Sequence, residues 1–343
     1  MLDDLKLIHE KDAQDALGIA EKQWQQLEYN LPIINPEDLA GIQNIVVTGM
    51  GGSALAALLF SSWPAINIPF EISRNYSLPK YVNKHTLVIA SSYSGNTEET
   101  LSSLAEAGEK GAQIAIIAGG GKLLEIAKEK GYRYIELPPA SQPRFAVLYG
   151  LNALVTIFAT TSLINKKYLV ELRESAGFLK QATAQWAPTV AKKDNLAKQL
   201  AYEAIGTSPV VYSGPFLYPV AYKWKISFNE NAKNVAWCNQ YPEFNHNEFL
   251  GWTSHPLDKP YRIFELRSNL DHPQITKRFE ISDRLLSGRR PSAQVIKVEG
   301  DSQLQQILWA VALGDFVSLY TAILNGLNPT PVDIIEKLKK ELA

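Results

Sequence analysis

The stretch SSYSGNTEET, residues 91–100, carries four serine and threonine hydroxyls and a glycine in its first seven positions. It follows an apolar segment typical of a buried strand, 86–90 (TLVIA), and precedes a helical pattern that begins near Glu98. A hydroxyl-rich turn at a helix N-terminus directs backbone N–H groups and the positive end of the helix dipole to one point. The turn has no lysine, so it does not match the nucleotide loop GxxxxGK[ST]. The sequence therefore predicts a cradle for a single phosphate of a small molecule. The simpler alternative is that these residues only cap the helix.

Strand and helix patterns alternate on both sides of this loop. Strands are expected at 44–48, 86–90, 113–118 and 132–137, and in a second series at 209–213, 235–238, 261–266 and 293–298. Helices are expected at 2–29, 53–60, 98–110, 123–130, 144–164, 216–229, 273–286, 304–325 and 331–342. Short apolar strands that alternate with helices indicate parallel sheets covered on both faces.

The two halves share one arrangement, in which an apolar strand runs into a glycine-containing turn (GMGGSA, 49–54; SGPFL, 213–217) and then into a helix. We therefore expect an α/β protein with two domains of one type. The expected boundaries are an N-terminal helix and linker (1–40), a first domain (41–165), a helical connection (166–205), a second domain (206–326) and a C-terminal helix (327–343).

Composition narrows the class of protein. The 343 residues are 46% hydrophobic and 20% charged, with 34 basic and 35 acidic residues, so no global field favours nucleic acid or an anionic membrane. One cysteine, Cys238, excludes a disulfide framework and is expected to be a buried small hydrophobe. Residues 146–164 and 307–324 are strongly apolar, but hydroxyls and Asp315 interrupt them, which favours core helices. A cytoplasmic protein is expected.

The turn GMGGSA also fits the dinucleotide fingerprint G-x-G-x-x-A, with Glu71 near the place of a ribose-binding acid. An NAD-dependent dehydrogenase is therefore one alternative. The fingerprint accounts for the glycines but not for the hydroxyl loop forty residues later. If Ser53 opens the next helix, both loops leave the carboxyl edge of the sheet and can hold one phosphate between them.

GMGGSA followed by SSYSGNTEET resembles the sugar isomerase (SIS) domain, a flavodoxin-like phosphosugar-binding fold. Three further motifs, NENAK (229–233), NHNE (245–248) and GDFVSLYTAILNGLNPTPVDIIEKLK (314–339), resemble the bifunctional phosphoglucose/phosphomannose isomerase family. The resemblance implies two tandem SIS domains with three αβα layers. It also implies a cofactor-free isomerisation of hexose 6-phosphates through a cis-enediol.

The resemblance assigns roles to particular residues. Glu230 carries the proton between C1 and C2, and Arg144, at the start of a long helix, stabilises the enediolate oxygen. His246 and Lys337 open the sugar ring, with His246 contributed by the neighbouring subunit of a homodimer. Thr330 contacts the substrate and leaves room for either C2 epimer. The phosphate or adjacent hydroxyls are bound by Gly51, Gly52, Ser53, Ser92, Ser94 and Thr97.

Some questions stay open at this stage. Glu248 could support the reaction, and its role is undecided. No His-x-His or HExxH spacing occurs, so no metal is implied. A non-catalytic phosphosugar sensor would keep the hydroxyl loops without needing Glu230, His246 and Lys337, and it stands as the main alternative to an enzyme.

Overall fold

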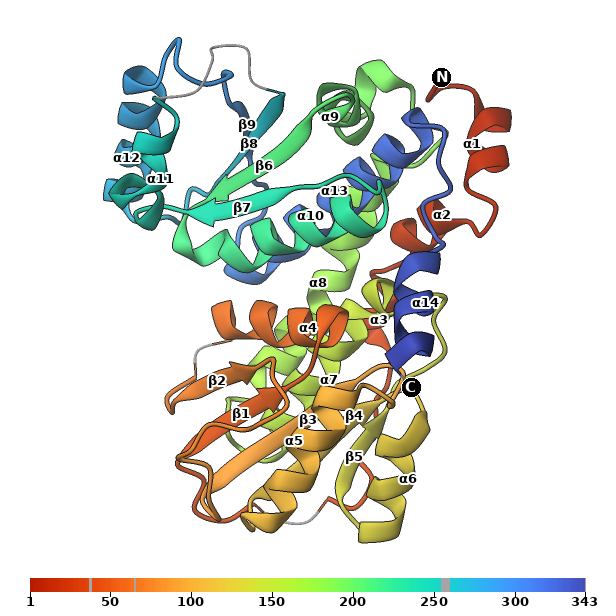
Figure 1. Cartoon of the computed structure of the whole chain (residues 1–343), viewed down its shortest axis with the longest axis vertical. Helices are drawn as coiled ribbons and strands as arrows, with labels where there is room; N and C mark the ends of the chain where they lie inside the picture. The colour runs from red at the N-terminus through yellow and green to blue at the C-terminus, as the bar shows by residue number, and fades with distance from the viewer. Residues whose placement is uncertain (37–38, 65, 254–259, 343) are drawn as a thin grey trace. The chain divides into compact units, whose positions relative to one another are not determined.

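Among the residues described, the strands form two parallel β-sheets, one in each of two units (Figure 1). The computed structural model describes residues 1–36, 39–64, 66–253 and 260–342. The N-terminal unit is Gln23–Gly177, and the C-terminal unit combines Met1–Lys22 with Phe178–Ala343. Helix α8 (Lys167–Ala184) contains the boundary between them.

The N-terminal unit is built on five parallel strands in the order β2-β1-β3-β4-β5. These are β1 (Asn44–Thr48), β2 (Phe70–Ser73), β3 (Thr86–Ser92), β4 (Gln113–Ala118) and β5 (Arg133–Glu136). This is the flavodoxin-like order, in which the direction of winding reverses between the first and third strands. Ligands of open α/β sheets bind outside the carboxyl ends of the strands at such a reversal. The glycine turn after β1 and the hydroxyl loop after β3 flank this point.

Helices cover both faces of this sheet. On one face α4 (Gly51–Ser62) packs against α7 (Val147–Thr160), which also contacts α3 (Gln25–Glu28). On the other, α5 (Glu98–Glu109) and α6 (Gly121–Lys130) close a core that includes Val88, Ile116, Leu104 and Leu123. Burial on both faces explains why β3 and β4 read as continuous apolar runs.

The C-terminal unit repeats the pattern with four parallel strands in the order β7-β6-β8-β9. These are β6 (Ser208–Ser213), β7 (Trp237–Gln240), β8 (Tyr261–Arg267) and β9 (Gln294–Lys297). Its order matches that of the first four strands of the N-terminal unit. The predicted fold class, two α/β domains of one type, is confirmed.

One face of this second sheet is covered by α10 (Tyr218–Glu230), which packs on α13 (Gln303–Leu324), and α13 in turn packs on α9 (Leu196–Ala204). The other face packs against η4 (Glu243–His246) and α12 (Pro273–Leu285) through Tyr212, Phe244 and Phe279. The remaining elements are α1 (Leu5–Lys11), α2 (Ala16–Glu21), η1 (Pro143–Phe145), η2 (Lys192–Asp194), η3 (Pro215–Leu217), α11 (Glu248–Gly251) and α14 (Asp333–Leu342).

Helix α13 is, within the described ranges, the one helix long and apolar enough to cross a membrane. All of its most apolar 18-residue window is buried inside the protein. Both apolar segments are thus core helices, as predicted, since α7 is also buried over nearly its whole length.

Two predicted helices differ from the structure by more than two residues at an end. Residues 2–29 form three short helices. The first break follows from Asp12, which accepts N–H bonds from Ala16 and Leu17 (both 2.8 Å), and from Asp15, which takes a left-handed conformation (φ 54°). The long helix begins at Val147, so Arg144 does not open it. Arg144 lies instead in the separate 3₁₀ turn η1.

The strand predicted at 235–238 begins two residues later, at Trp237. Side chains take the place of strand partners just before it: Asn229 Oδ1 accepts from the Ala236 N–H (3.1 Å) and Asn234 Nδ2 donates to the Thr207 carbonyl (2.9 Å). These amide bonds delay the start of the ladder. Cys238 is therefore on the edge strand and only partly buried, not a core residue, although burial raises the pKa of its thiol to about 11.

Candidate active site

The hydroxyl loop after β3 is folded around the Ser92 side chain. Ser92 Oγ lies 2.7 Å from Thr97 Oγ1 and 3.4 Å from Ser94 Oγ, and it accepts from the Gly95 N–H at 3.2 Å. Gly95 has φ +69°, and a Cβ there would lie 1.7 Å from the Gly120 carbonyl oxygen, so only glycine fits this turn. Thr97 is the N-cap residue of α5. Three hydroxyls therefore gather at a helix N-terminus, the arrangement that binds anions.

The glycine turn after β1 lies against this loop. Ser53 Oγ accepts a hydrogen bond from the Tyr93 N–H (3.2 Å), and a Cβ on Gly49 would come within 2.7 Å of the Ser91 carbonyl oxygen. The prediction that both loops leave one edge of the sheet is confirmed. Ser53 does not open the helix, however, because α4 begins two residues earlier, at Gly51. The backbone φ of Gly51 is +50°, which favours glycine at that position.

Arg144 belongs to the same cluster and is buried, with 2% of its surface exposed. A Cβ on Gly52 would lie 2.9 Å from the Pro143 carbonyl oxygen and 3.4 Å from Arg144 Cα, so the turn η1 packs directly on the start of α4. Nη1 of Arg144 donates to Gln142 Oε1 at 3.4 Å, and the guanidinium carbon of Arg144 lies 4.7 Å from the centre of the Phe145 ring. The residues predicted from the first half and brought together here are Gly51, Gly52, Ser53, Ser92, Ser94, Thr97 and Arg144.

The corresponding switch point of the C-terminal unit is built differently. At Gly214, which follows β6, an added Cβ would lie 2.2 Å from Asp271 Oδ1. The Asp271 carboxylate thus lies against the turn, and it accepts from the Ser268 N–H at 3.3 Å. A carboxylate at this point repels a phosphate. Of the two switch points described, the one in the N-terminal unit is therefore better suited to an anion, although both sheets share one strand order.

Glu230 is the last residue of α10 and is half-buried. Lys233, three residues later, has φ 53°. Its three ammonium N–H groups are shared among four main-chain carbonyls, those of Glu230 (3.0 Å), Asn231 (3.3 Å), Asn328 (3.0 Å) and Pro329 (2.9 Å). Thr330 comes next in the chain and is buried. Lys233 therefore joins the end of α10 to the segment that carries Thr330.

Helix α10 is held on α13 by buried polar contacts that help to place its end. The ammonium of Lys223 (1% exposed) bonds to Asp315 Oδ1 (6% exposed) and donates to Ser227 Oγ at 2.7 Å. One turn further on, Asn231 Nδ2 donates to Ser318 Oγ at 2.9 Å. These contacts fix both the height and the rotation of α10.

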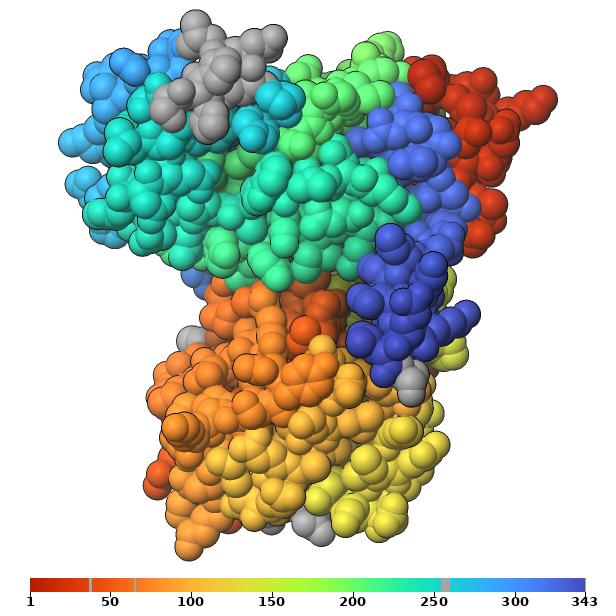
Figure 2. All heavy atoms as spheres, in the orientation of Figure 1, coloured from red at the N-terminus to blue at the C-terminus, as the bar shows by residue number. Residues whose placement is uncertain are grey.

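His246 and Lys337 are placed on other elements and are exposed. His246 is the last residue of the 3₁₀ turn η4. Lys337 lies on α14 and pairs with Glu341 at 3.8 Å, with 76% of its side chain exposed. The apolar residues Ile334 and Leu338 of the same helix are exposed as well (82% and 57%), and α14 stands open on the surface (dark blue in Figure 2).

Comparison with known proteins gives matches along most of the chain. The profile of the bacterial phospho-glucose isomerase C-terminal SIS domain matches residues 193–342. The bifunctional phosphoglucose/phosphomannose isomerase of Caldicellulosiruptor bescii is 38% identical over 308 residues, which cover 88% of this chain and 90% of that protein. The chain belongs to the bifunctional phosphoglucose/phosphomannose isomerase family.

Other relatives show how far this family reaches. A D-glucosamine-6-phosphate 4-epimerase of Sulfolobus acidocaldarius is 34% identical over 224 residues, covering 63% of this chain and 67% of the epimerase. A glucose-6-phosphate isomerase-like protein of Thermus thermophilus shares the fold, with a TM-score of 0.67 at 17% identity over 99% of this chain and 98% of that one. The tandem SIS fold of this phosphoglucose/phosphomannose isomerase family member is thus shown.

Several residues of this isomerase family member that make structural contacts had no predicted role. Lys233 lies in the motif NENAK, three residues after Glu230, and this spacing could have indicated that the two residues lie close together. No local sequence pattern could have indicated the partners of Glu248, because Tyr212 and Asn239 lie on two other elements, β6 and β7. The same holds for the pair Lys223 and Asp315, which are 92 residues apart. In the part of the chain that the structure describes, no three His, Cys, Asp or Glu side chains gather as a metal site requires.

Proposed function

We propose that this protein is a cytoplasmic aldose–ketose isomerase that interconverts glucose 6-phosphate and mannose 6-phosphate with fructose 6-phosphate. The observation that carries the proposal is the 38% identity to the C. bescii isomerase, which spans 88% of this chain and therefore parts of both units. The hydroxyl cradle at the β1/β3 switch point supports it, because it suits the single phosphate of a hexose 6-phosphate.

In this proposal the phosphate is bound by the N-terminal unit. The N–H groups at the starts of α4 and α5 and the hydroxyls of Ser53, Ser92, Ser94 and Thr97 donate to its oxygens, while Gly51 and Gly52 allow close backbone approach. Arg144 stabilises the enediolate oxygen. Its burial supports this role, because a guanidinium stays charged when buried and its field is stronger in a low dielectric.

The proton chemistry falls to residues of the C-terminal unit. Glu230 takes the proton from one carbon and returns it to the other, while His246 and Lys337 transfer the protons that open the ring. Thr330 contacts the sugar near C2, and its small side chain accepts either epimer. The placement of Glu230 at a helix end tied to the segment before Thr330 supports the pairing of these two residues.

Activity is tested with fructose 6-phosphate, with glucose 6-phosphate and mannose 6-phosphate measured separately. Both products are expected. Turnover of neither would favour the phosphosugar sensor. Glucosamine 6-phosphate is included because one relative is a 4-epimerase. A dehydrogenase is disfavoured by the 38% identity to an isomerase over 88% of this chain.

We further propose that the enzyme is a homodimer in which His246 acts at the neighbouring subunit's site. Glu230→Gln and His246→Ala proteins, each nearly inactive, are unfolded together and refolded. Half of the dimers are then mixed, and one of the two sites in each mixed dimer is intact, so about a quarter of wild-type activity is expected. Recovery of no activity from a mixture shown to contain mixed dimers would refute the shared site.

A further inference from the structure

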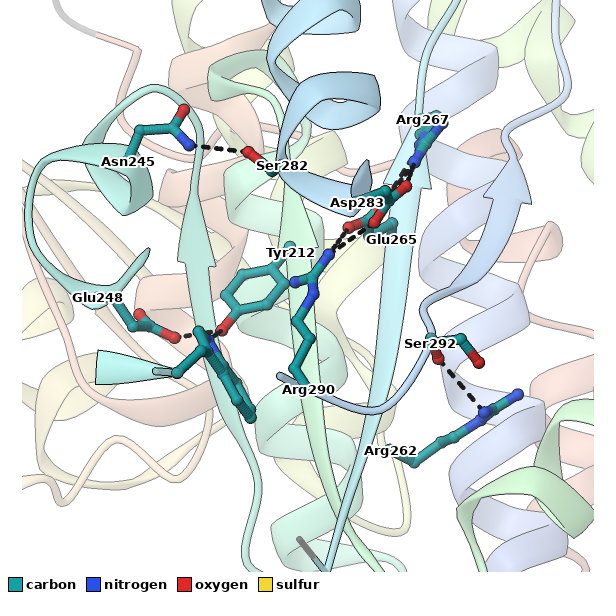
Figure 3. Close-up of polar contacts among 11 residues, drawn as sticks. Tyr212, Asn245, Glu248, Arg262, Glu265, Arg267, Ser282, Asp283, Arg290 and Ser292 are labelled. Carbon is teal, nitrogen blue, oxygen red and sulfur yellow. Dashed lines mark hydrogen bonds and ion pairs between the residues drawn. The ribbon is translucent and has the colours of Figure 1, made fainter. Parts of the chain in front are cut away.

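The segment Tyr241–Glu248, which carries His246, is fastened to its unit on two sides (Figure 3). On the side of α12, Asn245 makes two bonds: its Nδ2 donates to Ser282 Oγ at 2.9 Å, and its Oδ1 accepts from Arg278 Nη1 at 3.2 Å. The residue immediately before His246 is thereby tied to two successive turns of a helix.

On the side of the sheet, the Glu248 carboxylate receives a donor at each oxygen. Tyr212 donates its hydroxyl to Oε1, and Asn239 Nδ2 donates to Oε2 at 2.7 Å. The Tyr212 oxygen in turn accepts from Trp252 Nε1 at 3.1 Å. Burial, reinforced by the Glu248 charge, holds the pKa of Tyr212 well above its usual range, so the phenol remains a donor.

Apolar side chains of the segment itself pack into the core of its unit. Phe244 and Tyr241 are fully buried, and the ring centre of Tyr241 is 4.2 Å from that of Phe279. The guanidinium carbon of Arg290 lies 5.8 Å from the centre of the Phe244 ring, and its Nη2 bonds to Glu265 (2.8 Å) and Asp283 (2.7 Å). The segment therefore cannot shift without disturbing a buried ion network.

His246 and Asn247 are the exposed residues between these two fastened positions. Asn247 accepts from the Glu248 N–H at 2.5 Å, and its Nδ2 donates to Glu243 Oε1 at 2.6 Å, so it closes the turn on itself. The backbone of His246 is thus set by bonds on both sides, and the entropy of ordering it is lost on folding, before substrate binds.

We propose that Asn245 and Glu248 are positioning residues that hold His246 in the orientation its proton transfer requires. This inference rests on the proposed function and gives Glu248 a role. In this proposal Glu248 anchors the segment, and the donors at its two oxygens, Tyr212 and Asn239, support that role. A misplacement of about 1 Å can cost about 10²-fold in rate, so loss of either fastening is expected to act on kcat.

The test is a mutant cycle with fructose 6-phosphate. Asn245→Ala and Glu248→Ala are each measured alone and combined with His246→Ala. Alone, each is expected to lower kcat by roughly 10- to 100-fold with KM changed less than about threefold. Combined with His246→Ala, neither should lower kcat further, because the residue it positions is gone. A fall of equal size in both backgrounds would show a purely structural role.

A second readout does not depend on turnover. Amide hydrogen exchange at residues 243–248 is expected to speed up at least about tenfold in both variants, and unchanged exchange would overturn the proposal. Asn245→Ala is less prone to misfold than Glu248→Ala, since it removes only two partly buried hydrogen bonds. If the wild-type protein turns over no hexose phosphate, the proposed function fails, and that result is distinct from failure of the cycle.

Gln294→Ala is the matched control. Gln294 Oε1 accepts from Arg262 Nη2 at 3.2 Å, a bond between β8 and β9. Arg262 lies apart from Asn245 and Glu248 in Figure 3. Wild-type kcat and wild-type exchange at 243–248 are expected. A fall in kcat equal to that of the two test variants would mean that any polar loss in this unit has the same effect, and the proposal would fall.

Discussion

Replacing Glu230 by glutamine is expected to lower kcat with fructose 6-phosphate by roughly 10³-fold or more, within the range that a general base supplies. Glutamine has nearly the same size and keeps hydrogen-bonding capacity, but its amide cannot take a proton from carbon. The bond to Lys233 should survive, because Lys233 binds the main-chain carbonyl of Glu230. Phosphosugar affinity should therefore change less than about threefold, since the residues proposed to bind the phosphate belong to the N-terminal unit.

Two measurements separate chemistry from binding in this variant. Exchange of the C2 proton of glucose 6-phosphate with solvent deuterium, followed by NMR, should fall with kcat, while calorimetric titration with fructose 6-phosphate should give a near wild-type Kd. Glu109→Gln is a matched control, because Glu109 is also the last residue of an α-helix, α5, and is exposed. If Glu230→Gln retains proton exchange, another group carries the proton.

The largest expected loss of stability follows from Asp315→Ala. This change leaves the Lys223 ammonium (1% exposed) buried without its carboxylate. Removing one partner of a buried ion pair typically costs about 3–5 kcal/mol, much of the 5–15 kcal/mol by which most domains are stable. The free energy of unfolding, measured by urea titration, should fall by that amount, and the protein should lose activity at lower temperature as the end of α10 loosens.

The double variant Lys223→Met with Asp315→Leu tests whether the buried charge is the cause. Replacing both members of a buried pair by apolar residues is often neutral or stabilising, so stability should recover most of the loss. If the double variant is as unstable as Asp315→Ala, shape at the α10–α13 contact, not the unpaired ammonium, accounts for the effect. Trp224 packs closely on Gly314, where an added Cβ would lie 2.3 Å from Nε1. A change in side-chain shape near this contact is therefore the alternative explanation for a loss of stability.

Local patterns were enough to predict the fold and the place of the hydroxyl loop at the edge of the sheet. The strands β1 and β4 were predicted with their observed bounds, because each is a continuous apolar run between polar turns. The hydroxyl loop could be found because its residues lie within seven positions and bond to one another. Its strand was predicted two residues short, since buried Ser91 and Ser92 look like loop residues in sequence.

What could not be predicted depends on contacts between distant segments. The burial of Arg144 follows from packing of η1 on Gly52, which lies 92 positions earlier in the chain. The sequence around Arg144 does not indicate this burial. Glu248 is held by a hydrogen bond from Tyr212 of β6. This contact depends on how the strands pair, and the sequence of one segment alone does not predict the register of β6 and β7. The first break in the N-terminal helix arises from two aspartates, Asp12 and Asp15, that cap locally, a signal that the overall amphipathic pattern conceals.

Lys233 has a consequence for how such an enzyme can diversify. It holds residues 328 and 329 through their carbonyl oxygens, which every amino acid possesses. These two bonds do not depend on which side chains follow, although the Asn328 side chain adds bonds of its own to Gln14 (2.8 Å) and to the Thr330 N–H (3.0 Å). Because Thr330 comes next, a lineage that keeps Lys233 and Asn328 can exchange the side chain proposed to meet the sugar and keep the backbone that presents it. Substrate preference can drift at this position while the scaffold stays constant.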